Sequence, residues 1–489
     1  MRWHLAALFL LGLAVRVWLI HRYPVIFGGD SILRLANTEH ISLGYQLPLL
    51  QAAIHYLSHL SGDPLLVRYF MAVVGAVAGI GFYLFAATLL TRPVAFQTSL
   101  LFVASPMVLV HSIVPYQEIL MVAGLLFAFH GAFTGRWLVA SLSLGLACLT
   151  RYEAWLACPL VALAYLWRKG FSARRVLEAG LLFGFAPLAW IGLNGGLAPS
   201  GGYTIEPMSS PERLLRWVGL GGAAVKGTSI VALPIVAVGL GAFFKRGLLR
   251  SPQYQLLVGY LAAFLVAILF SAHGVGDQPE RRVTGREAHA IVIGLTLLFG
   301  IGLRELGRFR WTTVLASVTV GLWMADRDVA RVTAEPDLAL SYEVGRYLDR
   351  HVTASQDVAV LVPGLDVGDY LAKLERLKGP GAWRAGLGVR NALPIGYQRI
   401  LVHSRLGKQR LHTYASVGLG PFASDSNDVG VPGDSSETPD WVVVWGDFTP
   451  TNHYEAALAE RTRELPPQRV FAQGTSEARV YRIVVATRF

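Results

Sequence analysis

The sequence has few charged residues and only two cysteines. Asp, Glu, Lys and Arg make up 15% of its 489 residues, whereas soluble domains usually carry about 25%. Because 53% of the residues are hydrophobic, this composition excludes an ordinary soluble enzyme, a disordered chain and a disulfide scaffold. Cys148 and Cys158 both fall inside apolar runs, where we expect them to be small core residues.

Several catalytic motifs are absent as well. The chain contains no Walker loop, no Gly-x-Ser-x-Gly and no His-Glu-x-x-His. ATP-driven transport and hydrolysis by serine or zinc therefore lose support.

The charged residues that are present lie unevenly along the chain. Residues 1–331 carry a net charge of +12, whereas residues 332–489 hold 35 of the 75 charged residues and a net charge of −1. This asymmetry predicts a transmembrane domain over 1–331 and a soluble domain over 332–489. The basic residues of the first domain belong to membrane loops, so we expect no nucleic-acid partner.

Long apolar runs fill the first domain, and a run of about 17–20 residues can cross a bilayer as a helix. The sequence predicts about eleven such spans, at residues 3–20, 66–90, 94–112, 117–134, 137–152, 153–167, 176–195, 225–243, 253–271, 288–304 and 311–325. The first is interpreted as an uncleaved helix with its amino terminus in the cytoplasm, which puts short basic loops inside. The long first outer loop (21–65) and the tail then lie on the extracytoplasmic face.

The first outer loop holds the first candidate catalytic residue. Asp30 follows two glycines at a membrane boundary, where glycine lets a ligand approach the backbone closely. Its carboxylate suits either a general base for an acceptor hydroxyl or the start of a helix. Helices are predicted over 31–42 and 48–60. The second carries His55 and His59, which form either a metal pair or two side chains at headgroup level.

Two further charged motifs lie at the ends of predicted spans. Glu118 stands where the third span turns into the fourth, and it is either functional or a carboxylate favoured by a helix N-terminus. Arg151 and Glu153 separate two short spans. Arg151 suits a phosphate, because guanidinium matches phosphate oxygens bidentately, and a structural ion pair with Glu153 is the alternative.

A cluster of arginines precedes the tenth predicted span. Arg281, Arg282 and Arg286 fall within six residues. Such a cluster is typical of an anion site, which binds either a substrate phosphate or lipid headgroups.

The tail has the pattern of a small α/β domain without a catalytic constellation. Helices are predicted over 338–351 and 452–462, and strands over 357–362, 400–402, 441–445 and 478–485. The Gly- and Ser-rich residues 417–440 are expected to form a loop. Acceptor binding, coverage of the site and a role in folding alone remain the alternatives for this domain.

The order of these features resembles the GT-C glycosyltransferases, and most closely glycosyltransferase family 39, which contains protein O-mannosyltransferases and the lipid A aminoarabinose transferase. The resemblance rests on Asp30 in a long first loop, Glu118 after the third span and the stretch Gly145–Glu153, which is similar to the bacterial members. Glu280-Arg281-Arg282 stands where the family often has an arginine before a late span. The chain departs from the family in two ways, since no prolines follow that arginine and Asp30 has no adjacent acid.

The resemblance implies a polytopic α-helical enzyme that moves a sugar from a polyprenyl-phosphate donor to an extracytoplasmic acceptor hydroxyl. Asp30 would act as base in an inverting displacement, and Glu118 would hold the acceptor, orient the site or bind a metal ion. Charge neutralisation of the donor phosphate would fall to Arg151, Arg281 and Arg282. Glu153, Tyr116 and His111 are expected to support these groups.

The resemblance implies no certain cofactor and leaves open a divalent ion, Mg²⁺ or Mn²⁺, at Asp30 and Glu118. The expected partners are a polyprenyl-phosphate-linked sugar, a lipid, glycan or protein acceptor, and the bilayer of a bacterial inner membrane. The alternatives are a flippase or transporter of a lipid-linked sugar and a non-catalytic scaffold. The transporter is less favoured, because the polar residues lie at the outer ends of spans and no internal repeat is seen.

Overall fold

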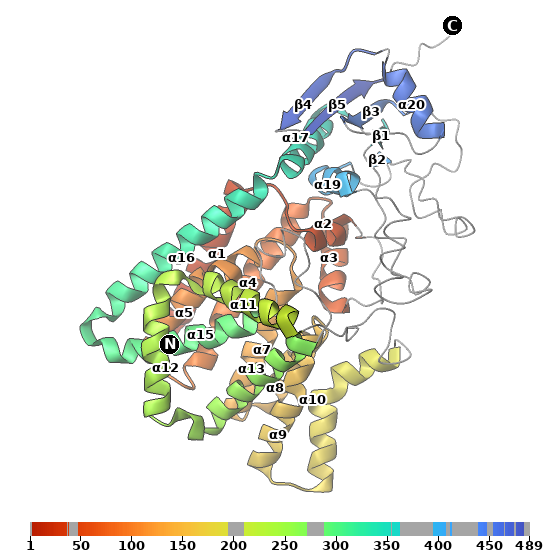
Figure 1. The fold of residues 1–489 in the computed structure, drawn as a ribbon. Coiled ribbons are helices and arrows are strands. Elements are labelled where there is room, and N and C mark those ends of the chain that lie inside the picture. Colours follow the sequence, from red (N-terminus) through yellow and green to blue (C-terminus); the bar gives the residue numbers. More distant parts are fainter. Residues whose placement is uncertain are drawn as a thin grey trace. The chain divides into compact units, whose positions relative to one another are not determined.

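The computed structural model describes residues 2–36, 38, 47–193, 210–270, 288–353, 355–361, 395–406, 411–412, 439–446, 453–463, 465–473 and 476–483 (Figure 1). The chain divides into two compact units. The first contains residues 1–23, 41–56 and 65–330, and the second contains residues 24–40, 57–64 and 331–489. The second unit therefore joins the tail to two short pieces of the first outer loop.

The first unit is built from helices. Its α-helices are α1 (Arg2–Arg22), α4 (Pro64–Ala86), α5 (Arg92–Ala104), α6 (Pro106–Val110), α7 (Gln117–Thr134), α8 (Trp137–Cys148), α9 (Ala157–Lys169), α10 (Ala173–Leu193), α11 (Ser210–Thr228), α12 (Leu233–Lys245), α13 (Pro252–Phe270) and α15 (His289–Leu303). Short 3₁₀ turns are η1 (Tyr152–Leu156), η2 (Ile230–Ala232), η3 (Leu248–Arg250) and η5 (Arg304–Phe309). Helices α3 (Pro48–Leu60) and α16 (Arg310–Thr333) each extend from one unit into the other.

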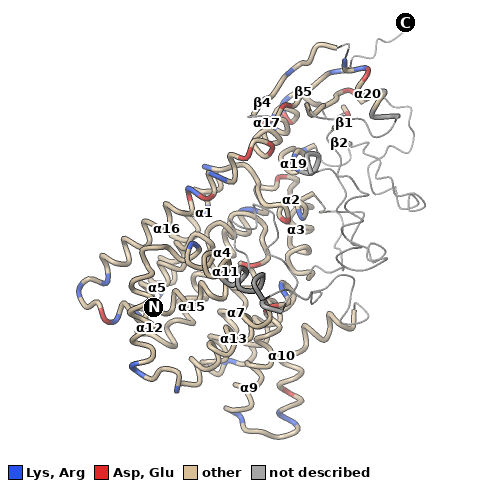
Figure 2. The backbone as a smooth tube through the Cα atoms, viewed as in Figure 1, with Lys and Arg blue, Asp and Glu red and all other residues tan. Residues whose placement is uncertain are grey.

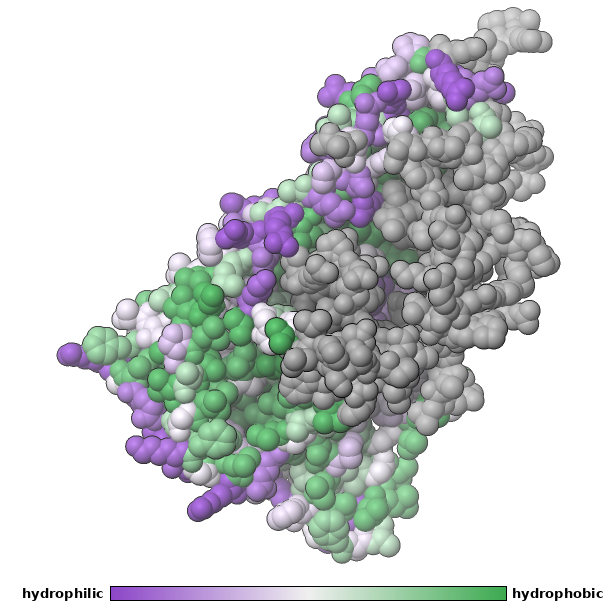
Figure 3. Space-filling model, in the orientation of Figure 1, coloured by the Kyte–Doolittle hydropathy of each residue, from purple (hydrophilic) through white to green (hydrophobic). Residues whose placement is uncertain are grey.

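These helices make an integral membrane protein. Within the described residues, five helices are long and apolar enough to cross a membrane, or six when a bent pair counts as one span. They are Arg2–Arg22, Pro64–Ala86, Gln117–Thr134, Ala173–Leu193 and His289–Thr333, the last of which counts α15, η5 and α16 as one stretch. Charged residues are sparse along the helices (Figure 2), and the surface over them is largely apolar (Figure 3). The count of eleven spans stays a prediction.

One predicted span is broken by a proline. Within 94–112, α5 ends at Ala104 and α6 begins at Pro106. The residue between them, Ser105, has φ −60° and ψ 129°, because the ring of a following proline disfavours helical geometry.

The span predicted over 225–243 is wrong as a straight helix. The chain bends by 95° between Val218–Thr228 and Ile230–Lys245. Ser229 stands at the bend with φ 118°, a conformation that a residue with a side chain seldom adopts. Hydropathy does not report such a backbone conformation, so the sequence alone predicted a continuous run.

Helices α12 and α15 meet backbone to backbone. A Cβ atom at Gly239 would lie 1.8 Å from the carbonyl oxygen of Leu298, and one at Gly302 would lie 2.2 Å from that of Ile235. Only glycine fits at these two positions, and such small residues let neighbouring membrane helices approach closely.

The second unit contains a five-stranded sheet in the order β2-β1-β3-β5-β4. The strands are β1 (Val358–Leu361), β2 (Leu411–His412), β3 (Trp441–Trp445), β4 (Arg469–Gln473) and β5 (Ser476–Arg482). Strand β1 pairs in parallel with β2 and β3, whereas β5 runs antiparallel to β3 and β4. The predicted strands at 357–362, 441–445 and 478–485 are therefore present, and β2 and β4 were not predicted.

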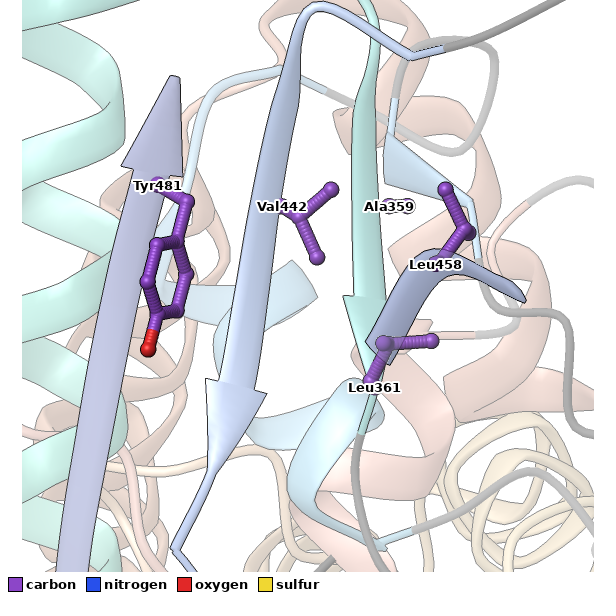
Figure 4. Packing of buried hydrophobic residues seen from close by; sticks show 5 residues of the cluster. All are labelled: Ala359, Leu361, Val442, Leu458 and Tyr481. Atoms are coloured by element: carbon purple, nitrogen blue, oxygen red, sulfur yellow. The ribbon is translucent and has the colours of Figure 1, made fainter. Parts of the chain in front are cut away.

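Helices cover both faces of this sheet. The face that carries Val442 and Tyr481 packs against Leu458 of α20 (His453–Arg463), together with Ala359 and Leu361 (Figure 4). The other face belongs to α17 (Pro336–His351), where the ring of Tyr347 contacts Trp441 and Phe471. Alternation along each strand sends neighbouring side chains to opposite helices, which explains both contacts.

A further helix joins the tail to the first outer loop inside this unit. Helix α19 (Ile395–His403) packs against both α17 and α2 (Gly29–Ala36). The predicted strand at 400–402 is therefore wrong, because three apolar residues in a row fit a buried helix turn as well as a strand. The helix predicted over 31–42 ends at Ala36 in the described residues, and most of the predicted loop 417–440 lies outside them.

Candidate functional site

The turn between α6 and α7 is fixed by two arginines buried inside the membrane unit. Arg16 of α1 donates from Nε to the hydroxyl of Ser112 at 2.6 Å. Arg68 of α4 donates from Nε to the carbonyl oxygen of Ile113 at 2.8 Å. Both guanidinium groups are fully buried. Non-helical backbone at membrane depth needs such donors, because lipid offers none.

The same turn leads into Glu118 in the first turn of α7. Its side chain is 1% exposed, and Oε1 accepts a hydrogen bond from Nη1 of Arg151 at 2.5 Å. Arg151 has extended backbone between α8 and η1, with φ −148° and ψ 145°. This conformation separates the two short helices and leaves the guanidinium next to the start of α7.

Arg151 binds a second carboxylate at the same time. Its Nε and Nη2 atoms donate to Oε2 and Oε1 of Glu153 at 3.0 and 2.5 Å. The ion pair that the sequence left open beside a phosphate role is thus present, and Glu118 joins it. Two carboxylates and one guanidinium give this centre a net charge of −1 when all three are ionised.

One atom of this centre has no hydrogen bond within the described part of the chain. Oε2 of Glu118 is buried and lacks a donor there. A buried carboxylate oxygen normally has a partner, because an unsatisfied one is unfavourable. A ligand hydroxyl is one candidate donor for this oxygen.

The predicted supporting residues His111 and Tyr116 lie together. Nδ1 of His111 is 2.9 Å from Nε2 of His289 at the start of α15, and the His111 ring meets the Tyr116 ring edge-on at 4.9 Å between centroids. Both histidines are buried. A hydrogen bond between two ring nitrogens holds one shared proton, so one of the two nitrogens is unprotonated.

Two neighbours of these groups were not predicted from the sequence. His289 reaches His111 across 178 residues, and no local pattern marks it. Tyr260 of α13 is 1% exposed, and the charges of Glu153 and Arg151 act on it. Its hydroxyl has no hydrogen bond in the part of the chain that the structure describes. A tyrosine within an apolar run, with a buried hydroxyl, was the available signal for Tyr260.

Asp30 belongs to the second unit. Gly28 has φ +84°, and its carbonyl oxygen accepts hydrogen bonds from the N–H groups of Ser31 and Ile32. This glycine turn starts α2 and puts Asp30 in its first turn, as the N-terminal motif predicted. The Asp30 side chain is 36% exposed and lies 3.7 Å from Nη2 of Arg34.

The remaining site predictions are not decided by these contacts. Arg281 and Arg282 lie outside the described residues. Among the residues that are described, no three His, Cys, Asp or Glu side chains lie close enough together to hold a metal ion. The roles of the candidate residues stay predictions.

Comparison with solved structures identifies the fold. No protein-family model and no curated protein sequence matches the chain. The crystal structure of ArnT from Cupriavidus metallidurans bound to undecaprenyl phosphate is similar with a TM-score of 0.59 at 13% identity, over 99% of this chain and 98% of ArnT. The chain has the GT-C fold. The apo state of the same ArnT gives a TM-score of 0.57 at 13% identity, over 97% of each chain.

A second GT-C protein supports the same conclusion. The cryo-EM structure of the arabinofuranosyltransferase AftD from Mycobacteria has a TM-score of 0.51 at 17% identity, over 99% of this chain and 40% of AftD. The resemblance to GT-C enzymes is thus confirmed at the level of architecture. At these identities the likeness concerns the fold alone.

Proposed function

We propose that the chain is an integral-membrane glycosyltransferase that moves a sugar from a polyprenyl-phosphate donor to an acceptor hydroxyl on the extracytoplasmic face. The observation that carries the proposal is the similarity, over nearly the full length of both chains, to ArnT crystallised with undecaprenyl phosphate. The buried charged centre at Arg151 supports it, because ionisable side chains inside membrane proteins usually serve a site.

In the proposed reaction the leaving group is a lipid phosphate. The bond between the anomeric carbon and the phosphate oxygen breaks, and the phosphate departs with the bonding electrons without needing a proton. The acceptor hydroxyl attacks from the opposite side and gives its proton to a base. We assign that role to Asp30, which is partly exposed at the start of α2. A single displacement inverts the configuration of the anomeric carbon.

The centre at Arg151 has a different part in the proposal. Oε2 of Glu118 accepts a hydrogen bond from a substrate hydroxyl, and Arg151 positions Glu118 by holding its other oxygen. Arg151 can bind the donor phosphate only if the phosphate displaces a carboxylate oxygen from its guanidinium. Arg281 and Arg282 are therefore the better candidates to neutralise the leaving phosphate.

The proposal assigns no step to a divalent ion, whose presence at Asp30 and Glu118 stays a prediction. Among the described residues, no three His, Cys, Asp or Glu side chains lie close enough together to hold a metal ion, and Arg281, Arg282 and their neighbours lie outside those residues. We therefore derive no step through Mg²⁺ or Mn²⁺.

The test is release of polyprenyl phosphate from a panel of polyprenyl-phosphate sugars by the purified protein. Wild type is expected to release it, and Asp30→Asn to release none above background. Asp326→Asn is the matched control, because it makes the same change at a partly exposed carboxylate that pairs with Arg22. Equal release by wild type and Asp30→Asn would remove Asp30 from the chemistry.

A flippase gives a different result in the same preparations. It would move a fluorescent lipid-phosphate sugar across vesicles without releasing polyprenyl phosphate, and Asp30→Asn would leave that movement intact. Transport without release by the wild-type protein would therefore overturn the transferase.

A further inference from the structure

The only two cysteines of the chain touch each other inside the membrane unit. Sγ of Cys148 lies 3.5 Å from Sγ of Cys158, and both residues are buried. Cys148 is the last residue of α8, and Cys158 is the second residue of α9. We propose that these two thiols are joined by a disulfide in the folded protein.

The residues between the two thiols carry the charged centre described above. They leave α8 at Cys148, pass through Arg151 and Glu153, and return to α9. The indole N–H of Trp155 donates to the carbonyl oxygen of Cys148 at 2.9 Å, so the segment folds back onto the end of α8. A bond between Cys148 and Cys158 would join the end of α8 covalently to the start of α9 and close the segment between them into a loop.

The position of the pair along the helices argues for an oxidising compartment. Helix α8 begins after Arg136, and α9 ends with Arg168 and Lys169. These basic residues mark the cytoplasmic ends of both helices by the positive-inside rule. The thiols stand at the opposite ends and therefore toward the extracytoplasmic side, where disulfides form and persist.

The chemistry needs a small movement and an electron acceptor. A disulfide has a sulfur–sulfur distance of about 2.05 Å, so rotation of one or both side chains has to close the gap of 3.5 Å. Each thiol loses one proton and one electron. A disulfide-carrying exchange protein of the extracytoplasmic space takes up both electrons and both protons through a mixed disulfide and leaves as a dithiol.

The burial of the two thiols determines when the disulfide forms relative to membrane insertion. The attacking species in exchange is the thiolate, which is unfavourable in apolar surroundings. The bond therefore forms while α8 and α9 insert, before the pair is covered. Once covered, it resists reductants that act on the folded protein.

The consequence for activity rests on the proposed function. The disulfide keeps Arg151 and Glu153 against Glu118 by fixing both ends of the segment that carries them. Loss of the bond lowers the rate of donor turnover by roughly three- to tenfold, because small displacements of positioned groups reduce rates steeply.

The first test counts thiols without reference to activity. Membranes are quenched in acid, the protein is denatured, and N-ethylmaleimide adducts are measured by intact mass before and after reduction. We expect no adduct before reduction and one on each cysteine after it. Adducts on both cysteines of the unreduced sample would overturn the proposal. Cys148→Ala serves as control, since it must leave Cys158 free to react.

The second test compares the two single variants with the double variant. If one bond joins the cysteines, Cys148→Ala, Cys158→Ala and the double variant lower the unfolding temperature and the turnover rate equally. If the cysteines are only packed side by side, a reductant present during thermal unfolding leaves the wild-type unfolding temperature unchanged, and the proposal fails. The thiol count and the unfolding temperature test the disulfide even if the protein shows no donor turnover. Failure of the proposed function is therefore distinguishable from failure of the disulfide proposal.

Discussion

The backbone N–H of Ile26 donates a hydrogen bond of 2.9 Å to Nε2 of His403, a residue 377 positions further along the chain. Ile26 precedes the glycine turn that begins α2, and His403 ends α19. Because Nε2 accepts this bond, it carries no proton in this arrangement. The tail thus holds the backbone four residues before Asp30, which gives the C-terminal domain a part in positioning the proposed base.

We predict that His403→Phe removes the acceptor for the Ile26 N–H and lowers stability, and that His403→Gln, which offers an acceptor oxygen, lowers it much less. Phenylalanine leaves a buried N–H without an acceptor, at about 1–3 kcal/mol of unfolding free energy, whereas glutamine offers an oxygen. The measurements are the thermal unfolding temperature in detergent and the release of polyprenyl phosphate. Equal loss of turnover in both variants would show that the acceptor atom is irrelevant.

Arg151→Met is expected to destabilise the membrane unit strongly. It leaves Glu118 and Glu153 facing each other without their shared cation, and breaking a buried ion pair in this way typically removes about 3–5 kcal/mol. The triple variant Arg151→Met, Glu118→Gln, Glu153→Gln should recover most of the unfolding temperature, because no unpaired charge remains. A wild-type unfolding temperature for Arg151→Met alone would contradict the shared arrangement.

Gly75→Ala tests the arginine that holds the turn before α7. A Cβ atom at Gly75 would lie 2.3 Å from Nε of Arg16 and 2.5 Å from Cβ of Ser112, so the guanidinium must move. We expect a loss of about 1–3 kcal/mol from overpacking. Gly180→Ala is the matched control, since nothing lies within 4 Å of its Cβ position and alanine favours a helix by about 0.5–1 kcal/mol over glycine. Similar behaviour of the two variants in a thermal scan would disprove the tight fit.

Tyr260→Phe is expected to lower donor turnover without lowering the unfolding temperature. The hydroxyl is buried without a hydrogen bond among the described residues, so its removal should leave the unfolding temperature unchanged or higher. If the hydroxyl meets the substrate beside Arg151 and Glu153, donor turnover falls. Tyr254→Phe in the same helix is the comparison, because it removes a long bond to the carbonyl oxygen of Leu89 and should leave turnover intact. A fall in turnover for both variants would refute a specific role.

The sequence predicted those parts of the molecule that depend on local pattern. Long apolar runs located helices such as α1 and α7, and a short apolar run located β3. Local pattern failed at residues 400–402, where the packing of α19 decides the conformation, and at Ser229, where the backbone bends against the hydropathy. Such choices depend on tertiary contacts, which a short window of sequence does not contain.

The candidate site shows the same division. The contact of Arg151 with Glu153 spans two residues and was predicted as one alternative. The sharing of Arg151 with Glu118 spans 33 residues, and the pairing of His111 with His289 spans 178. Only the folded bundle brings these groups together. Residue type and spacing could therefore mark them as candidates but could not predict which of them are in contact.

The glycine contacts between α12 and α15 bear on the route by which the proposed polyprenyl donor reaches the interior of the bundle. At Gly239 and Gly302 the two backbones leave no room even for a methyl group. A polyprenyl chain is far wider than that, and it cannot slip between these two helices at that level. A lipid that leaves the bilayer sideways at this level has to pass between other helices. We therefore expect no lateral entry site for the proposed donor between α12 and α15 at the level of Gly239 and Gly302.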